Sequence, residues 1–395
     1  MKKGWEIKKL SDVLEVQNGY AFNSKKFNTS LGTPLIRIRD LKNGERTQTL
    51  FEGDFDQKYI VSAGDLLIGM DGEFGCYEWK GQKALLNQRV CKLQNFSTHI
   101  LPRFLFYGVN SHLKAIEDIT GYATVKHLSS KQILNIEFPV PPLAEQRRIV
   151  GILDEAFAGI AEAKAHAEKN LQNARELFES HLNAVFSQRG DGWEEKRLGD
   201  VAEKISTGPF GTMLHKSDYV TDGIPLVNPM NIVNSKIVPS SKMMVDEATR
   251  ERLIVYALKR GDIVIARRGK LGRCALVTEH EEGWLCGTGS FFVRLKETIT
   301  GEFFVSLFSS KPFRERLESY SVGTTMSNLN HGILKELVLP LPPLKEQHKI
   351  MARAQELSSE TQSLESIYQQ KLTSLEELKK SLLHQAFTGK LTMDN

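Results

Sequence analysis

Two turns in the sequence share a glycine frame but carry opposite charges. GMDGEFG (69–75) aligns with ARRGKLG (266–272), so that Asp71 matches Arg268 and Glu73 matches Lys270. An arginine can donate two hydrogen bonds to O6 and N7 of guanine, and a carboxylate can accept one from the cytosine amine. The two turns could therefore select different bases, and two further arginines could contribute on the second one: Arg267, which lies within it, and Arg273, which follows it. The alternative is a pair of solvated turns whose charges have drifted.

A basic stretch in the first half of the chain could bind phosphates. In LIRIRDLKNGER (35–46), alternation along a strand would place Arg37 and Arg39 on one face, and a basic stripe on one face is typical of nucleic-acid binding. Lys42 and Arg46 follow in the same stretch. The corresponding LVNPMNIVNSK (226–236) has Asn228 and Asn231, which could read adenine or could simply form an Asn-Pro turn. Surface ion pairing is the alternative for the arginines.

Further polar and aromatic residues lie in segments that we predict to be loops. YATVKHLSS (122–130) and TTMSNLNHG (324–332) are polar loops that precede the two long helices described below, and GYAFNSKKF (19–27) and TGPFGTMLHKSDY (207–219) add aromatic and basic residues. We include as candidate DNA contacts Lys126, His127, Asn328, Asn330, Tyr20, Lys25, Lys26 and Lys216. His127 alone would more often be an ordinary surface histidine.

No set of residues predicts catalysis or a metal site. The Pro-Pro pairs VPPL and LPPL lack the polar residue that would hold a flipped adenine, and no G-x-x-x-x-G-K-S/T segment occurs. LCGTGSFF (285–292) offers only a lone G-x-G. The four cysteines form no C-x-x-C pair, which favours reduced thiols over zinc ligands. We therefore predict neither catalytic residues nor metal ligands.

Length and composition fit a globular protein of two or three domains. The chain has 395 residues, 41% hydrophobic and 25% charged, with a net charge of +4. This mild basicity permits a polyanionic partner without requiring one. We expect a cytoplasmic location and no membrane, because the basic first residues lack the apolar region of a signal peptide and no apolar run could span a bilayer.

The sequence contains the same unit twice. GWEIKKLSDVLE (4–15) matches GWEEKRLGDVAE (192–203), AGDLLIGM (63–70) matches RGDIVIAR (260–267), and FPVPPLAEQ (138–146) matches LPLPPLKEQ (339–347), in the same order. Each copy is long enough to form its own core. Repetition on this scale indicates a duplicated domain rather than a solenoid.

Each copy combines a mixed domain with one long helix. Short strands are predicted at 65–70, 90–93, 262–266 and 291–295, and helices at 102–117 and 301–319. Apolar residues then recur every three or four positions over 149–186 and 350–386, which is typical of a coiled-coil seam. About 40 residues would span roughly 60 Å. We predict an α+β fold class in which the two helices pack against each other, antiparallel if the domains project from opposite ends.

The repeated P-P-L-x-E-Q phrase is a helix start signal. Proline suits the first turn, and a carboxylate there complements the positive helix end. A docking surface for a partner subunit is a second role for the same residues: Leu143, Glu145, Gln146, Leu344, Glu346 and Gln347.

The sequence resembles the specificity subunits of type I restriction–modification systems. P-P-L-x-E-Q opening a long helix twice, L-L-x-Q-A-F-T-G-K-L at 382–391, and G-W-x-x-x-x-L-x-D-V followed by a later G-D-I/L carry the resemblance over essentially the whole chain. It implies two target-recognition domains at 1–142 and 191–342. It also implies two helices, at 143–190 and 343–395, forming an antiparallel coiled coil.

The resemblance also implies a role and partners. Such a subunit is not itself an enzyme; it reads a bipartite site in double-stranded DNA and joins two adenine-methylating subunits with translocating nuclease subunits. No cofactor is expected in this chain, whereas S-adenosylmethionine, ATP and Mg are expected on the partners. A specificity chain of a fused restriction–methylation polypeptide, a divergent methyltransferase and an architectural spacer are the alternatives. Cofactor binding by the isolated chain would favour the methyltransferase, and a lack of sequence-dependent DNA binding would favour the spacer.

Overall fold

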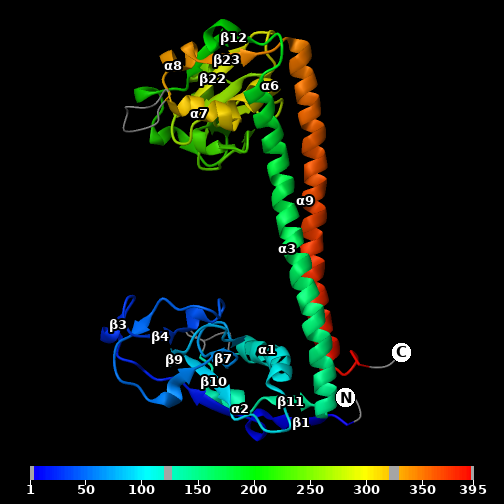
Figure 1. Cartoon of the computed structure of the whole chain (residues 1–395). Helices are drawn as coiled ribbons and strands as arrows, with labels where there is room; N and C mark the ends of the chain where they lie inside the picture. Colours follow the sequence, from blue (N-terminus) through cyan, green and yellow to red (C-terminus); the bar gives the residue numbers. More distant parts are fainter. Residues whose placement is uncertain (1–3, 120–126, 320–328, 393–395) are drawn as a thin grey trace. The chain divides into compact units, whose positions relative to one another are not determined.

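The computed structural model describes residues 4–119, 127–319 and 329–392. Contacts divide the chain into two compact units, one built from residues 1–166 with 371–395 and one from residues 167–370. Each unit therefore contains one mixed domain and a part of both long helices (Figure 1). Among the described residues no helix is both long and apolar enough to cross a membrane.

The first unit contains two small sheets beside a helix. One sheet has the order β2-β10-β7-β8, and the other has the order β3-β5-β4-β9-β6. β1 pairs separately with β11, where Glu6 lies opposite Val140. The strands are β1 (Glu6–Lys9), β2 (Glu15–Asn18), β3 (Phe27–Asn28), β4 (Thr33–Ile36), β5 (Leu50–Phe51), β6 (Ile60–Val61), β7 (Leu66–Gly69), β8 (Cys76–Glu78), β9 (Ala84–Leu86), β10 (Val90–Gln94) and β11 (Glu137–Val140). The helices are α1 (Pro102–Ile119), α2 (Ser130–Leu134) and the start of α3 (Leu143–Gln188).

The second unit repeats this plan. Its sheet β13-β22-β19-β20 matches β2-β10-β7-β8, and the parallel pair β15-β21 matches β4-β9. The strands are β12 (Glu194–Arg197), β13 (Ala202–Thr207), β14 (Tyr219–Val220), β15 (Ile224–Val227), β16 (Ile232–Val233), β17 (Lys236–Ile237), β18 (Met244–Val245), β19 (Ile263–Ala266), β20 (Cys274–Leu276), β21 (Leu285–Cys286), β22 (Ser290–Leu295) and β23 (Val338–Leu341). The helices are α4 (Leu198–Val201), α5 (Glu247–Arg252), α6 (Gly301–Ser309), α7 (Lys311–Ser319) and α8 (His331–Glu336), together with the end of α3 and the first part of α9 (Leu344–Phe387), whose last turns belong to the first unit. The duplication predicted from the sequence is thus present in the strand order.

The predicted helix at 301–319 was wrong as a single element. α6 ends at Ser309, and Ser310 has an extended backbone before α7 begins at Lys311. Pro312 lies in the first turn of α7, where its missing N–H leaves no helical bond unmade. The proline therefore suits the start of a second helix better than the middle of one.

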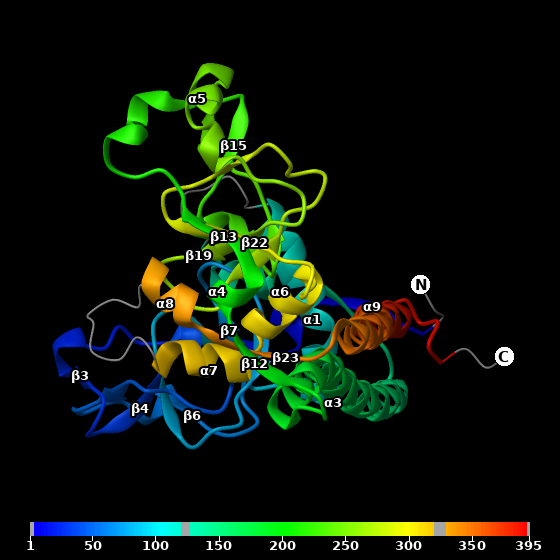
Figure 2. The same cartoon turned by 90° about the horizontal axis from the view of Figure 1, so that it is seen from above.

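The long helices α3 and α9 lie side by side (Figure 2) and run antiparallel, as predicted (Figure 1). In the first unit, Lys164 Nζ lies 2.6 Å from Glu376 Oε1, and in the second, Arg175 Nε lies 3.2 Å from Glu365 Oε2. Residue numbers thus fall along α9 as they rise along α3. The predicted seam is buried at Ala167, Leu171 and Ala174, whereas Leu364 and Leu378 stay 38% and 47% exposed, because two helices cover only one side of an apolar stripe.

The end of each long helix completes a domain core. In the first unit, Phe387 of α9 packs against Phe104 and Phe138, with ring centroids 5.0 and 5.8 Å away. In the second unit, Phe186 of α3 packs against Phe303 at 5.7 Å. The repeated segments 181–189 and 382–390 therefore carry equivalent aromatic anchors.

Candidate nucleic-acid interface

Four segments of the first unit meet at one end of its sheet. The Met70 N–H donates to Arg89 O, and the Leu128 N–H donates to Met70 O, at 3.0 and 2.7 Å. Tyr20 forms an isolated parallel bridge with Asn87. These bonds bring together the turn after β7, the turn before β10, the segment after β2 and the segment before α2, which together hold several of the predicted site residues.

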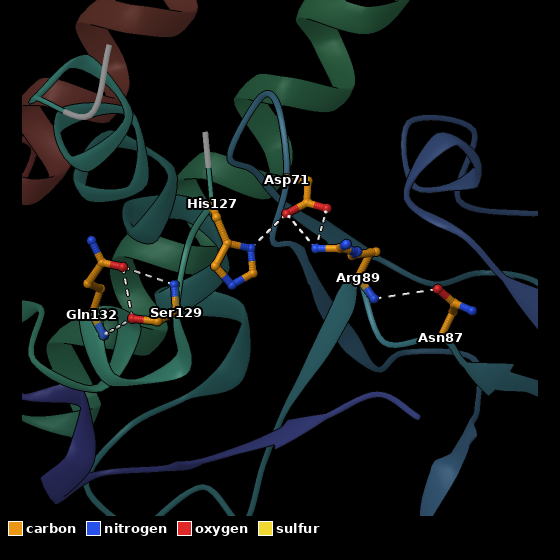
Figure 3. Close-up of polar contacts among 6 residues, drawn as sticks. All are labelled: Asp71, Asn87, Arg89, His127, Ser129 and Gln132. Atoms are coloured by element: carbon orange, nitrogen blue, oxygen red, sulfur yellow. Dashed lines mark hydrogen bonds and ion pairs between the residues drawn. The ribbon is translucent and has the colours of Figure 1, made fainter. Parts of the chain in front are cut away.

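Asp71 lies at the centre of a polar cluster with His127 and Arg89, as Figure 3 shows. Its Oδ1 is 2.7 Å from His127 Nδ1, and its Oδ2 is 3.0 Å from Arg89 Nη1. The side chain of Asp71 is only 23% exposed, against 51% for His127 and 54% for Arg89. Asp71 therefore uses both carboxylate oxygens inside the chain, and the exposed groups of the cluster are its two partners.

Glu73 is also paired within the turn. Its Oε2 lies 2.6 Å from Lys42 Nζ, and this hydrogen bond raises the pKa of the Lys42 ammonium above its ordinary value. Both side chains remain largely exposed, so the pair is solvated and contributes little to stability. Lys42 and Glu73, both predicted DNA contacts, neutralise each other here.

The predicted strand carrying Arg37 and Arg39 was wrong. β4 ends at Ile36, and a 3₁₀ turn, η3 (Ile38–Asp40), follows because the buried Asp40 carboxylate accepts the Arg37 N–H at 2.9 Å. Both arginines are exposed, with the Arg39 guanidinium donating to Thr49 at 3.1 Å. They remain accessible, but a turn rather than strand alternation positions them.

The segment after β2 carries an exposed aromatic side chain, Tyr20, and two lysines. Tyr20 is 50% exposed, and its ring lies 5.1 Å from both Phe22 and Tyr59. Lys25 and Lys26 are exposed in the short turn η2 (Ser24–Lys26), and Arg46 is exposed in the loop before β5. These predicted residues are available to a ligand.

The second unit presents two free cations on the corresponding turn. Arg268 and Lys270 are exposed, and neither side chain has an ionic or hydrogen-bonded partner among the described residues. Arg273 fixes the turn from within: its guanidinium donates to the carbonyl oxygens of Lys270, Pro229 and Arg268, at 3.3, 2.9 and 3.1 Å. Arg273, a predicted DNA contact, is therefore a structural residue that positions the other two.

Several other predicted contacts of the second unit are structural. Arg267 is half-buried over the Phe291 ring, 5.9 Å from its centroid. Asn231 is 2% exposed and accepts the Asn228 N–H at 3.0 Å, repeating the role of Asp40 in the first unit. Asn330 caps α8 by accepting the Ile333 N–H at 2.9 Å. The side chain of Asn228 contacts Gly289 and Met243, and Lys216 is exposed.

Two predicted contacts, Lys126 and Asn328, lie outside the described residues. Sequence reasoning also missed Arg89. The aligned backbone bonds, Met70 N–H to Arg89 O and Arg267 N–H to Gly289 O, show that Arg89 corresponds to Gly289. The available signal was an arginine in NQRV (87–90) where the second copy reads GTGS (287–290).

The glutamine of the P-P-L-x-E-Q phrase is buried in both units. Gln146 accepts the Leu101 N–H and donates to the carbonyl oxygens of His99 and Pro141, each at 2.8 Å. Gln347 makes the same three bonds with Thr300, Thr298 and Pro342, at 2.9, 3.0 and 2.9 Å. Both side chains are fully buried, so they tie each long helix to its domain and offer nothing to a partner.

The other residues predicted to dock a partner remain accessible to different degrees. Leu344 is 40% exposed and Leu143 is half-buried. Glu145 accepts a hydrogen bond from the Thr392 hydroxyl, and Glu346 Oε2 lies 3.7 Å from Lys349. The predicted docking surface is thus reduced to these four residues.

Comparisons with known proteins agree with the duplicated architecture. The sequence model of the family described as "Type I restriction modification DNA specificity domain" matches residues 2–171 and again 190–374. The chain is 29% identical to the EcoBI specificity subunit of Escherichia coli over 98% of this chain and 86% of that protein. It is 25% identical to the MjaVIII specificity subunit of Methanocaldococcus jannaschii over 86% of this chain and 82% of that protein.

Solved structures share the fold. A chain from a study titled "Structural basis underlying complex assembly and conformational transition of the type I R-M system" superposes with a TM-score of 0.72 and 19% identity, over 99% of each chain. The HsdS subunit from Thermoanaerobacter tengcongensis gives a TM-score of 0.62 and 18% identity, over 99% of this chain and 98% of that one.

Proposed function

Because the chain belongs to the type I restriction–modification DNA specificity family, we propose that each of its two mixed domains reads one half of a bipartite site in double-stranded DNA. The chain is the specificity subunit of such a system and not its catalyst. The loops at the ends of β7 and β19, together with the turn before β10 in the first domain, would supply the base contacts. Each loop would read a different sequence.

The observation that carries this proposal is that one frame holds two different sets of side chains. The strand orders β2-β10-β7-β8 and β13-β22-β19-β20 correspond, and so do the backbone bonds of the turns. On that frame the first unit places Arg89 and His127 around Asp71, whereas the second places Arg268 and Lys270. Phosphate contacts orient a protein on DNA, while differences in groups that reach base edges give specificity.

The long helices are the proposed platform for the partner subunits. Some apolar side chains of α3 and α9 are not covered by the other helix: Leu364 and Ile367 on α9 are 38% and 55% exposed, and Leu177 on α3 is 47% exposed. Exposed apolar surface of this kind favours association with another protein. We assign it, with Leu143 and Leu344, to two adenine-methylating subunits, to which the translocating nuclease subunits would be added.

The cofactors of the proposed complex belong to the partners. S-adenosylmethionine, ATP and Mg would be bound by the methylating and translocating subunits. This chain would select the DNA site at which they act. Its own contribution would be a set of pre-positioned donors and acceptors, with no proton transfer or covalent step.

Genome-wide mapping of methylated adenines tests this function. Cells carrying the gene with its partner subunits should show a two-part methylated motif that disappears when only this gene is deleted. Replacing Arg268 by Ala should relax one half of the motif and leave the other half unchanged. A motif that persists without the gene, or one without two separate halves, would refute the proposal.

A further inference from the structure

The Arg89 guanidinium is fixed at one end and open at the other. Its Nη1 lies 3.0 Å from Asp71 Oδ2 and 3.4 Å from Asp71 Oδ1. Neither Nε nor Nη2 of Arg89 has a partner among the described residues, and the side chain is 54% exposed. The Nε–Nη2 edge, which carries two parallel N–H donors, is therefore without a partner among the described residues, on a side chain that is half exposed.

Two parallel donors match the major-groove edge of guanine. O6 and N7 of guanine are adjacent acceptors, and a bidentate arginine is the commonest specific contact to them. A guanidinium already oriented by a carboxylate loses less conformational freedom when it binds than an unrestrained side chain does. The Asp71 contact thus prepares Arg89 for this kind of base contact.

The same geometry argues against a direct base contact by Asp71. Its two oxygens are occupied by Arg89 and His127, and its side chain is only 23% exposed. Accepting a hydrogen bond from the cytosine amine would require Asp71 to give up part of this network. His127 restrains Asp71 from the side opposite Arg89, as Figure 3 shows.

We propose that Arg89 is a specificity-determining residue that reads a guanine in the half-site of the first domain, and that Asp71 is its positioning residue. This inference rests on the proposed function and adds to it a base and the side chain that reads it. The second domain cannot use the same contact, because Gly289 occupies the position of Arg89. There the guanidinium comes from Arg268, on the opposite turn.

The test uses the complete complex of this chain with its methylating subunits. Methylated adenines are first mapped for the wild type, and binding is then measured on a duplex carrying that motif. Each guanine of the first half-site is replaced in turn by 7-deazaguanine, which lacks the N7 acceptor. One replacement should weaken binding by the wild type roughly tenfold, and the same replacement should have no effect on Arg89→Ala.

Control variants separate base reading from loss of structure. Lys83→Ala removes an exposed cation of the same unit and should keep the full motif. In Arg89→Ala, the half-site read by the second domain should stay intact, which reports a folded and assembled complex. Arg89→Lys should not restore the lost guanine preference, because an ammonium cannot form the bidentate contact.

The Asp71→Ala variant tests the positioning role. If Asp71 acts through Arg89, Asp71→Ala relaxes the same base position as Arg89→Ala, and the double variant is no worse than Arg89→Ala alone. If Asp71 reads a base itself, the two single variants relax different positions and their effects multiply. That second result, or retention of every guanine preference by Arg89→Ala, would overturn the inference.

The outcome remains distinguishable from a failure of the proposed function. If the wild-type complex methylates no two-part motif, the proposed function itself fails. If the motif exists but its first half responds to neither Arg89→Ala nor 7-deazaguanine, only the assignment of Arg89 fails.

Discussion

Replacing Gln146 by Ala should destabilise the first unit while sparing the second. The substitution removes three hydrogen bonds: the one accepted from the Leu101 N–H, and those donated to His99 O and Pro141 O. A buried polar group left without a partner costs about 1–3 kcal/mol. The Pro141 carbonyl contact is fully buried, whereas water can reach the two partly buried ones. We therefore expect a loss of about 3 kcal/mol, below the sum of three full penalties.

Amide hydrogen exchange is the appropriate assay, because a chain with two units does not unfold in one step. The Leu101 N–H should exchange about a hundredfold faster in Gln146→Ala. The Thr300 N–H, which donates to Gln347, should be unchanged, and Gln347→Ala should give the reverse pattern. Gln172→Ala, an exposed glutamine on the same helix, is the matched control and should change stability by less than about 0.5 kcal/mol.

Two results would refute this reasoning. The first is Gln146→Ala within about 0.5 kcal/mol of the wild type, which would mean that water satisfies all three groups. The second is an equal loss of protection at the Leu101 and Thr300 amides in Gln146→Ala, which would mean that the effect of losing one glutamine is not confined to its own unit.

Three further predictions follow from contacts in both units. Arg294→Ala should destabilise the second unit by about 3 kcal/mol in denaturant unfolding, because the fully buried Asp262 carboxylate loses its paired cation and the two 2.8 Å bonds that Arg294 donates, and keeps only the Lys259 N–H; a change below about 1 kcal/mol would contradict this. Arg273→Ala should weaken recognition at the second half-site as strongly as Arg268→Ala, without changing the first half-site in adenine-methylation mapping; selective recognition that survives would show that the turn holds its shape unaided. The four cysteines are buried: Cys76, Cys91, Cys274 and Cys286. Their thiols should resist a disulfide reagent at pH 8 until the chain unfolds, because burial raises the thiol pKa, to about 12 for Cys91 and Cys274. Rapid labelling of the native protein would contradict this burial.

Much of the fold could be predicted because repetition makes each copy a check on the other. The strands at 65–70, 90–93, 262–266 and 291–295 are present as β7, β10, β19 and β22. The long helices follow from their seam and from the proline that opens them. The G-D-I/L motif also has a local cause, since Asp65 and Asp262 each accept a backbone N–H in the turn before the strand, from Ser62 and Lys259, both at 2.8 Å.

The candidate site was harder to predict, because residue type does not reveal what a side chain already binds. Arg273 and Arg268 are five positions apart in one basic turn, yet the Arg273 guanidinium donates to three carbonyl oxygens and the Arg268 guanidinium makes none of these bonds. Asp71 lies 18 residues from Arg89 and 56 from His127, so its partners could not be inferred from spacing. The glutamines of the repeated phrase were predicted to lie on a docking surface, but both are buried. Their burial depends on the packing of segments distant in the sequence, which the phrase itself does not reveal.

The anchor at Phe387 has a consequence for biosynthesis. Phe104, Phe138 and Gly108 are made early by the ribosome, but the ring that covers them is translated only after the whole second domain. Until then the nascent first domain exposes an aromatic patch. Exposed apolar surface of this kind binds chaperones or leads to aggregation with neighbouring chains. In a chain whose synthesis stops before residue 380, the second domain has its aromatic anchor, Phe186, whereas the first domain still lacks its anchor, Phe387.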